Sequence, residues 1–79
     1  MLKIVREAYI YGCHRPGRTE PDWPNYVVNL VHAIPYSGNV LMNGIDGRFL
    51  VRENEECPFK NGDIVKVTIE LKKRKDDNA

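Results

Sequence analysis

The sequence predicts an all-β fold, and three features of the chain indicate it. Residues 64–72 alternate between apolar and polar side chains, which is the period of a strand with one buried and one wet face. The pair Asn61-Gly62 comes directly before this segment, and both residues tolerate the positive φ of a tight turn. Four other short apolar segments occur, and three of them end at Gly, Pro or Asn, as strands commonly do.

The first expected strand covers residues 2–11, where β-branched and aromatic residues dominate, and Gly12 ends it. A long irregular segment follows from Cys13 to Asn25, because three prolines and a glycine exclude regular structure there. Loops of this length in small domains often carry function, and this loop contains two arginines and the single tryptophan.

Residues 26–34 form the second expected strand, which is apolar on both faces and therefore predicted to be central. Residues 40–42 and 48–51 are expected to pair as a hairpin around the Asn-Gly and Asp-Gly pairs of residues 43–47. The last strand, residues 64–72, should bury one apolar face against the second strand. The expected core of this contact is Val28, Leu30, Val65, Val67, Ile69 and Leu71.

Five short strands in 79 residues cannot hide their edges in an open flat sheet. Closure of the sheet removes this problem, so we expect a small five-stranded antiparallel barrel, OB-like or alternatively SH3-like. Residues 1–73 are predicted to form this single small β domain, and residues 74–79 a charged, frayed C-terminal tail.

Composition narrows the function classes. The formal net charge is +1, so no global basic field attracts nucleic acid, and no apolar run is long enough for a transmembrane helix. The chain begins without the apolar segment of a secretion signal, and we therefore expect a cytoplasmic protein in which Cys13 and Cys57 are free thiols.

Neither a metal site, a cofactor nor catalysis is expected. Cys13, His14, His32 and Cys57 have the residue types of a zinc site but lack its paired spacing. A Cys-His nucleophile pair would need a base, an orienting group and an oxyanion site, for which a barrel of this size has little room.

Aromatic and basic residues suggest a binding surface, because aromatic rings stack on bases and arginines hold phosphates. We therefore predict a non-catalytic module that binds single-stranded nucleic acid through an Arg/Trp loop and an aromatic sheet face. The alternative is a small inhibitor or adaptor, for example of the phage type, that binds a larger protein, since Trp, Tyr and Arg are also preferred interface anchors. The oligomeric state is left open, a dimer included. The predicted contact residues are Tyr11, Arg15, Arg18, Trp23, Tyr26, Arg48 and Lys66.

Overall fold

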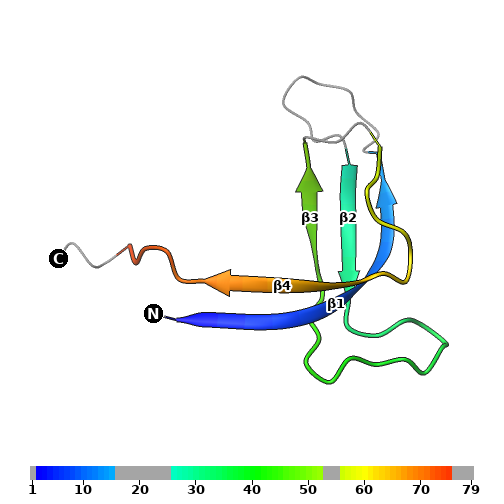
Figure 1. The fold of residues 1–79 in the computed structure, drawn as a ribbon, viewed down its shortest axis with the longest axis horizontal. Coiled ribbons are helices and arrows are strands. Elements are labelled where there is room, and N and C mark those ends of the chain that lie inside the picture. The colour runs from blue at the N-terminus through cyan, green and yellow to red at the C-terminus, as the bar shows by residue number, and fades with distance from the viewer. Residues whose placement is uncertain (1, 16–25, 53–55, 76–79) are drawn as a thin grey trace.

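The computed structural model describes residues 2–15, 26–52 and 56–75, and these form one four-stranded antiparallel sheet without a helix (Figure 1). The all-β prediction is therefore confirmed. The strand order is β3-β2-β1-β4, so β3 and β4 are the two edge strands. The strands are β1 (Lys3–His14), β2 (Tyr26–Val31), β3 (Gly47–Val51) and β4 (Ile64–Glu70).

The long strand β1 is shared between two parts of the sheet. Its second half pairs with β2, where Ile10 lies opposite Leu30, and its first half pairs with β4, where Lys3 lies opposite Glu70. The register with β2 shifts between Ile10 and Cys13, and Gly12 adopts a φ of 119° within this bulge. A bulge bends its strand, and β1 is strongly curved between its two halves (Figure 1).

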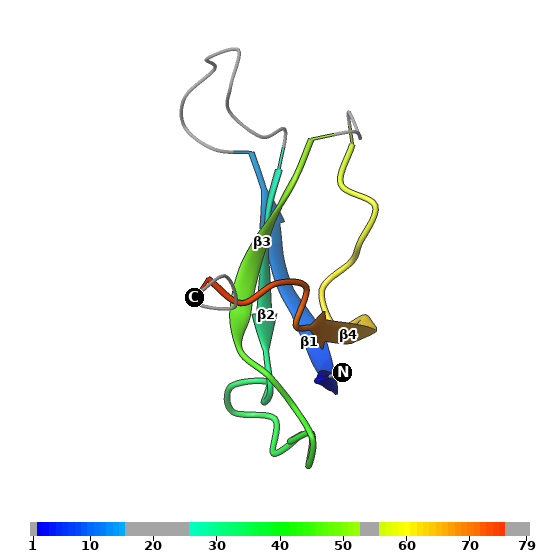
Figure 2. The same ribbon diagram turned by 90° about the vertical axis from the view of Figure 1, so that its left-hand side faces the viewer.

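Because β1 curves, the sheet curls into a half-barrel. Figure 2, viewed almost along β4, shows β4 on one side of the layer formed by β3, β2 and the end of β1. The hydrophobic core lies on the concave side, where Ile10 and Val28 are the largest side chains that are fully buried. The buried cluster also contains Ala8, Tyr26, Leu30 and Val51.

The expected five-stranded barrel is not what the described residues form, because residues 40–42 do not make a strand beside β3. Val40 has only an isolated bridge to Ala33, and the chain then turns towards β1. There Glu7 accepts a hydrogen bond from Ile45 N–H and donates its own N–H to the Asn43 carbonyl, 3.0 Å each. The backbone of the expected hairpin turn is thus used against β1, and Leu41 of the expected strand donates its N–H to the His32 carbonyl.

The predicted burial of the last strand is only partly correct. Val65 and Val67 pack against the core, but Ile69 and Leu71 are 46% and 36% exposed, so their expected burial is wrong. The reason is geometric: β4 and the first half of β1 continue beyond the other strands as a two-stranded ribbon (Figure 1). We call residues 2–8 and 65–71 the β1/β4 ribbon.

The tight turn before β4 is confirmed. Gly62 has a φ of 94°, which a residue with a side chain rarely adopts. Asn61 also contributes to the fold, because its side-chain oxygen accepts the N–H of Gly12 at 2.8 Å. The turn is thereby attached to the bulge of β1.

The expectation of two free thiols is wrong, because Cys13 and Cys57 form a disulfide with a Cα–Cα distance of 6.2 Å. Cys13 lies opposite Val28, on the core side of β1, and Cys57 packs against the same cluster. The expectation rested on the missing secretion signal, which says nothing about which side chains the sheet brings together. Disulfides persist mainly in oxidising compartments, so the cytoplasmic location stays a prediction that the cysteines do not support.

Candidate functional site

An open pocket of about 490 Å³ lies on the concave side of the half-barrel. Its walls come from β3 and the residues before it on one side and from β4 on the other, and these are the two edge strands of the sheet. The lining is mainly apolar, which is typical of binding pockets of this size. The apolar lining residues are Leu30, Ile45, Phe49, Phe59, Val65 and Val67.

Two phenylalanines fix one wall of the pocket. The rings of Phe49 and Phe59 meet edge to face, with 6.0 Å between their centroids and an interplanar angle of 82°. Phe59 belongs to the segment between β3 and β4, and the disulfide at Cys57 attaches this segment to β1 two residues earlier. The pocket wall therefore depends on the disulfide that sequence reasoning missed.

The backbone of β4 offers hydrogen-bonding groups to this pocket. Leu71 donates its N–H to the Leu2 carbonyl at 2.9 Å, which makes these two residues a hydrogen-bonded pair of the antiparallel ladder. Such pairs alternate along a strand, so Val67 and Val65 also bond to β1. The backbone groups of Lys66 and Thr68 then point away from β1, and both residues line the pocket.

The same alternation leaves a backbone position beside the pocket open on β3. Both backbone groups of Ile10 bond to the turn before β4, at 2.7 Å each, so Tyr9 is the residue whose groups point at β2. Val31, opposite Tyr9, therefore bonds to β1, and its neighbour Leu30 points its backbone groups at β3 instead. Leu30 and Gly47 are thus a hydrogen-bonded pair. The backbone groups of Arg48 then point outward, into the opening of the half-barrel, where Arg48 lines the pocket.

A histidine–aspartate pair holds the chain next to the pocket. Asp46 accepts the backbone N–H of His32 at 2.8 Å and lies 2.7 Å from His32 Nδ1. These bonds, the side-chain one first, lower the pKa of Asp46 below the ordinary carboxyl value. The sequence analysis did not pair these two residues. The signals that it had were a histidine near the end of the second expected strand and an aspartate in the Asp-Gly turn before the next one.

The predicted contact residues divide into three groups. Arg18 and Trp23 lie outside the described residues. Tyr26 is only 9% exposed, and the guanidinium carbon of Arg15 lies 5.1 Å from the centre of its ring. Tyr26 therefore belongs to the core and has Arg15 over one face, whereas Tyr11 is 47% exposed.

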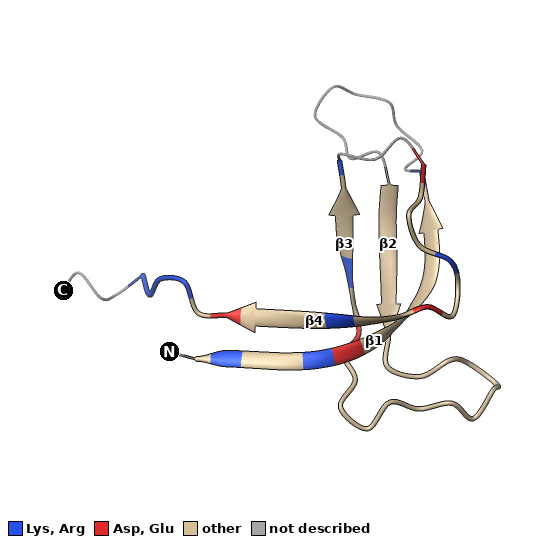
Figure 3. Ribbon diagram, viewed as in Figure 1, with Lys and Arg blue, Asp and Glu red and all other residues tan. Residues whose placement is uncertain are grey.

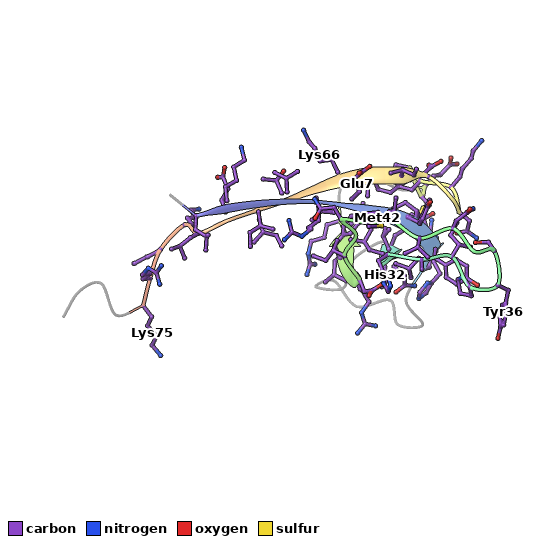
Figure 4. The ribbon with its side chains drawn as sticks, turned by 90° about the horizontal axis from the view of Figure 1, so that it is seen from below. Glu7, His32, Tyr36, Met42, Lys66 and Lys75 are labelled. Carbon is purple, nitrogen blue, oxygen red and sulfur yellow. A yellow bond between two sulfur atoms is a disulfide. The ribbon has the colours of Figure 1, made fainter. Side chains whose placement is uncertain are left out.

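Arg48 and Lys66 are the predicted residues that the fold brings to one place. They come from β3 and β4, the two edge strands, and both line the pocket. In Figure 4 the side chain of Lys66 projects away from the ribbon, so the pocket receives the backbone of this residue rather than its charge.

Charges on the ribbon alternate instead of forming a basic surface (Figure 3). Lys3 and Glu70 form an ion pair of 3.8 Å, and Lys66 lies opposite Glu7 in the register. Both members of the Lys3–Glu70 pair are about half exposed, so solvent screens the pair and it adds little stability. Lys3 and Lys66, one on each strand of the ribbon, therefore each have an acidic neighbour on the same face.

Within the described ranges, no group of three or more His, Cys, Asp or Glu side chains is placed to hold a metal ion. The same part of the chain has no helix of the length and hydropathy needed to span a membrane. Comparison of the chain with protein-family models, with curated proteins and with solved structures found no match.

Proposed function

We propose that this protein is a non-catalytic protein-binding module, an inhibitor or adaptor that takes an extended segment of a larger partner protein into the pocket between β3 and β4. The observation that carries the proposal is the position of the pocket between two strand edges that pair with no other strand in the described part of the chain. Unpaired edges are templates for another strand, and several peptide-binding domains bind in this way.

The chemistry of such a complex follows from the two kinds of group around the pocket. The backbone groups of Arg48, Lys66 and Thr68 would bond to the backbone of the incoming segment, and every second side chain of that segment would enter the apolar pocket. The added segment would act as the fifth strand, so the OB-like or SH3-like barrel expected from the sequence would be completed by the partner.

The proposal is tested by selecting peptides from a displayed random library against the parent protein and against two proline variants. Thr68→Pro removes a backbone N–H that points into the pocket, while the bonds between β4 and β1 remain. Glu70→Pro is the matched control, because its N–H points the same way but lies beyond the pocket. We expect peptides of alternating apolar pattern that bind the parent and Glu70→Pro and lose at least tenfold in affinity with Thr68→Pro.

Hydrogen exchange supplies a second measurement on the parent protein. Bound peptide should slow the exchange of the Lys66 and Thr68 amides, which have no partner in the β1/β4 ladder. Peptides that bind Thr68→Pro as tightly as the parent, or a library that yields no binder above background, would contradict the proposal.

Binding of single-stranded nucleic acid remains the second candidate, favoured by the cationic residue Arg48 at the pocket, by Lys66, whose charged end projects to the neighbouring wet face, and by the exposed ring of Tyr11. Its test is the affinity for an oligonucleotide as a function of salt. If both residues contact phosphates, Arg48→Ala with Lys66→Ala should flatten the logarithmic salt slope by about two. Absence of binding by the parent at low salt would remove this candidate and leave the protein-binding proposal untouched.

A further inference from the structure

The charge around the opening between β3 and β4 is one-sided. The charged residues that line the pocket are Asp46, Arg48 and Lys66. Asp46 is already bonded to His32, at 2.8 Å from its backbone nitrogen and 2.7 Å from Nδ1. Among the residues that the structure describes, neither Arg48 nor Lys66 takes part in an ion pair. The opening is therefore bordered by two cations that are available to a ligand and by one carboxylate that is in use.

Both cationic side chains lie on the outer, convex face of the sheet. Val65 and Val67 pack against the core, so the alternation of the strand puts Lys66 on the opposite face, and its side chain projects away from the ribbon (Figure 4). Phe49 packs against the core in the same way, which puts its neighbour Arg48 on the convex face of β3. Lys66 and Arg48 thus border the opening from its two sides.

A segment that adds to β4 has to follow the same alternation. Side chains directly opposite each other on paired strands share a face, and successive side chains of one strand point to opposite faces. The side chain opposite Lys66 would therefore point outward. The side chains before and after it would enter the pocket beside Val65 and Val67, which line it.

We propose that the bound segment carries an acidic side chain between two apolar ones, so that the partner protein is recognised by an apolar–acidic–apolar sequence. This inference rests on the proposed function, because it assumes that a strand of the partner pairs with β4. The carboxylate lies beside Lys66, with Arg48 at the other side of the opening. Opposite charges on paired strands stabilise the pairing and like charges destabilise it, so the same site disfavours a lysine or arginine at this position.

The acidic residues of the ribbon do not already fill this position. Glu7 lies opposite Lys66, but it belongs to β1, which is on the other side of β4 from the opening. Glu70 forms its ion pair with Lys3, beyond the part of β4 that lines the pocket. With the segment bound, Lys66 therefore has a carboxylate on each side, from Glu7 and from the partner.

The test uses peptides selected from the displayed library with the parent protein, which should be enriched in Asp and Glu between two apolar residues. One selected peptide is synthesised with Glu, Gln or Lys at that position, and its affinity is measured by fluorescence anisotropy. We expect the parent to bind the Glu peptide about fivefold more tightly than the Lys peptide at low salt, with a smaller difference at high salt.

Three variants locate the preference. Lys66→Glu should reverse it in favour of the Lys peptide, which also shows that the pocket is intact in this variant. Lys66→Gln puts no like charge opposite Glu7 and should weaken the preference without reversing it. Lys75→Glu is the matched control, because it changes the net charge as Lys66→Glu does but lies in the exposed segment after β4, far from Lys66 (Figure 4), and should keep the order of the parent.

The outcomes separate this inference from the proposed function. Selected peptides without acidic enrichment, equal affinity of the parent for the Glu and Lys peptides, or a Lys75→Glu variant that responds as Lys66→Glu does would overturn the inference while peptide binding itself stands. A library that yields no binder would remove the proposed function and this inference with it.

Discussion

Reduction of the Cys13–Cys57 disulfide should destabilise the fold strongly. The bond joins the end of β1 to the segment that leads into β4, and the two cysteines are 44 positions apart. Chain-entropy arguments assign about 4 kcal/mol to a cross-link that closes a loop of this length. A chain of 79 residues has a total stability of only about 4–12 kcal/mol, so the loss is a large fraction of it.

The measurement is urea unfolding followed by far-ultraviolet circular dichroism, with and without a phosphine reductant. We expect the reduced protein to unfold at a lower urea concentration, with a free energy of unfolding lower by about 4 kcal/mol. The double variant Cys13→Ala with Cys57→Ala is the control for effects of the reductant itself, because its unfolding should not respond to reductant. Coincident unfolding curves for the oxidised and reduced parent would refute the reasoning.

Two further predictions concern single residues. Gly62→Val should lower the free energy of unfolding by about 1–3 kcal/mol, because a φ of 94° is strained for a β-branched residue even though nothing lies within 4 Å of the added Cβ. Gly47→Val is the control, since Gly47 lies in a strand and has the same free space around its Cβ, and it should change the free energy little in the same urea assay. Asp46 should contribute to acid unfolding: its folded pKa is lowered, so its contribution is present above the ordinary carboxyl pKa and is lost as the pH falls through the folded value. Asp46→Asn should show a weaker decrease in melting temperature between pH 5 and pH 2 than the parent, and an unchanged decrease would contradict this role.

The sequence was informative where local chemistry decides the structure. Alternating residues located β4 almost to the residue, and Asn61-Gly62 identified the turn before it. The β1 strand was recognised as well, although it continues through Gly12 to His14 rather than ending at the glycine, because the bulge accommodates that residue within the strand.

Long-range contacts were the part that the sequence did not reveal. Residues 40–42 have the composition of a strand, but the residues that follow them, Asn43 and Ile45, bond to Glu7 of β1. Asp46 then bonds to His32, so residues 40–42 form no ladder with β3. The disulfide depends on the register of two distant segments, which spacing in the sequence does not encode. Exposure of Ile69 depends on how far the ribbon extends beyond its neighbours, and periodicity alone cannot distinguish a covered apolar face from an uncovered one.

The shared strand β1 also determines the order in which this chain can fold. Its second half can pair with β2 early, since the two strands are neighbours in the sequence. Its first half pairs with β4, the last strand of the described chain, and so can pair only after β4 has been synthesised. Until then the edge of β1 that faces β4 is unpaired, and the apolar side chains of Ile4 and Val5 lack the β4 neighbours that they have in the folded sheet. Contacts between such distant segments slow folding, typically to milliseconds or seconds. The same strand that joins the sheet together is thus the segment exposed longest to aggregation while the protein is being synthesised.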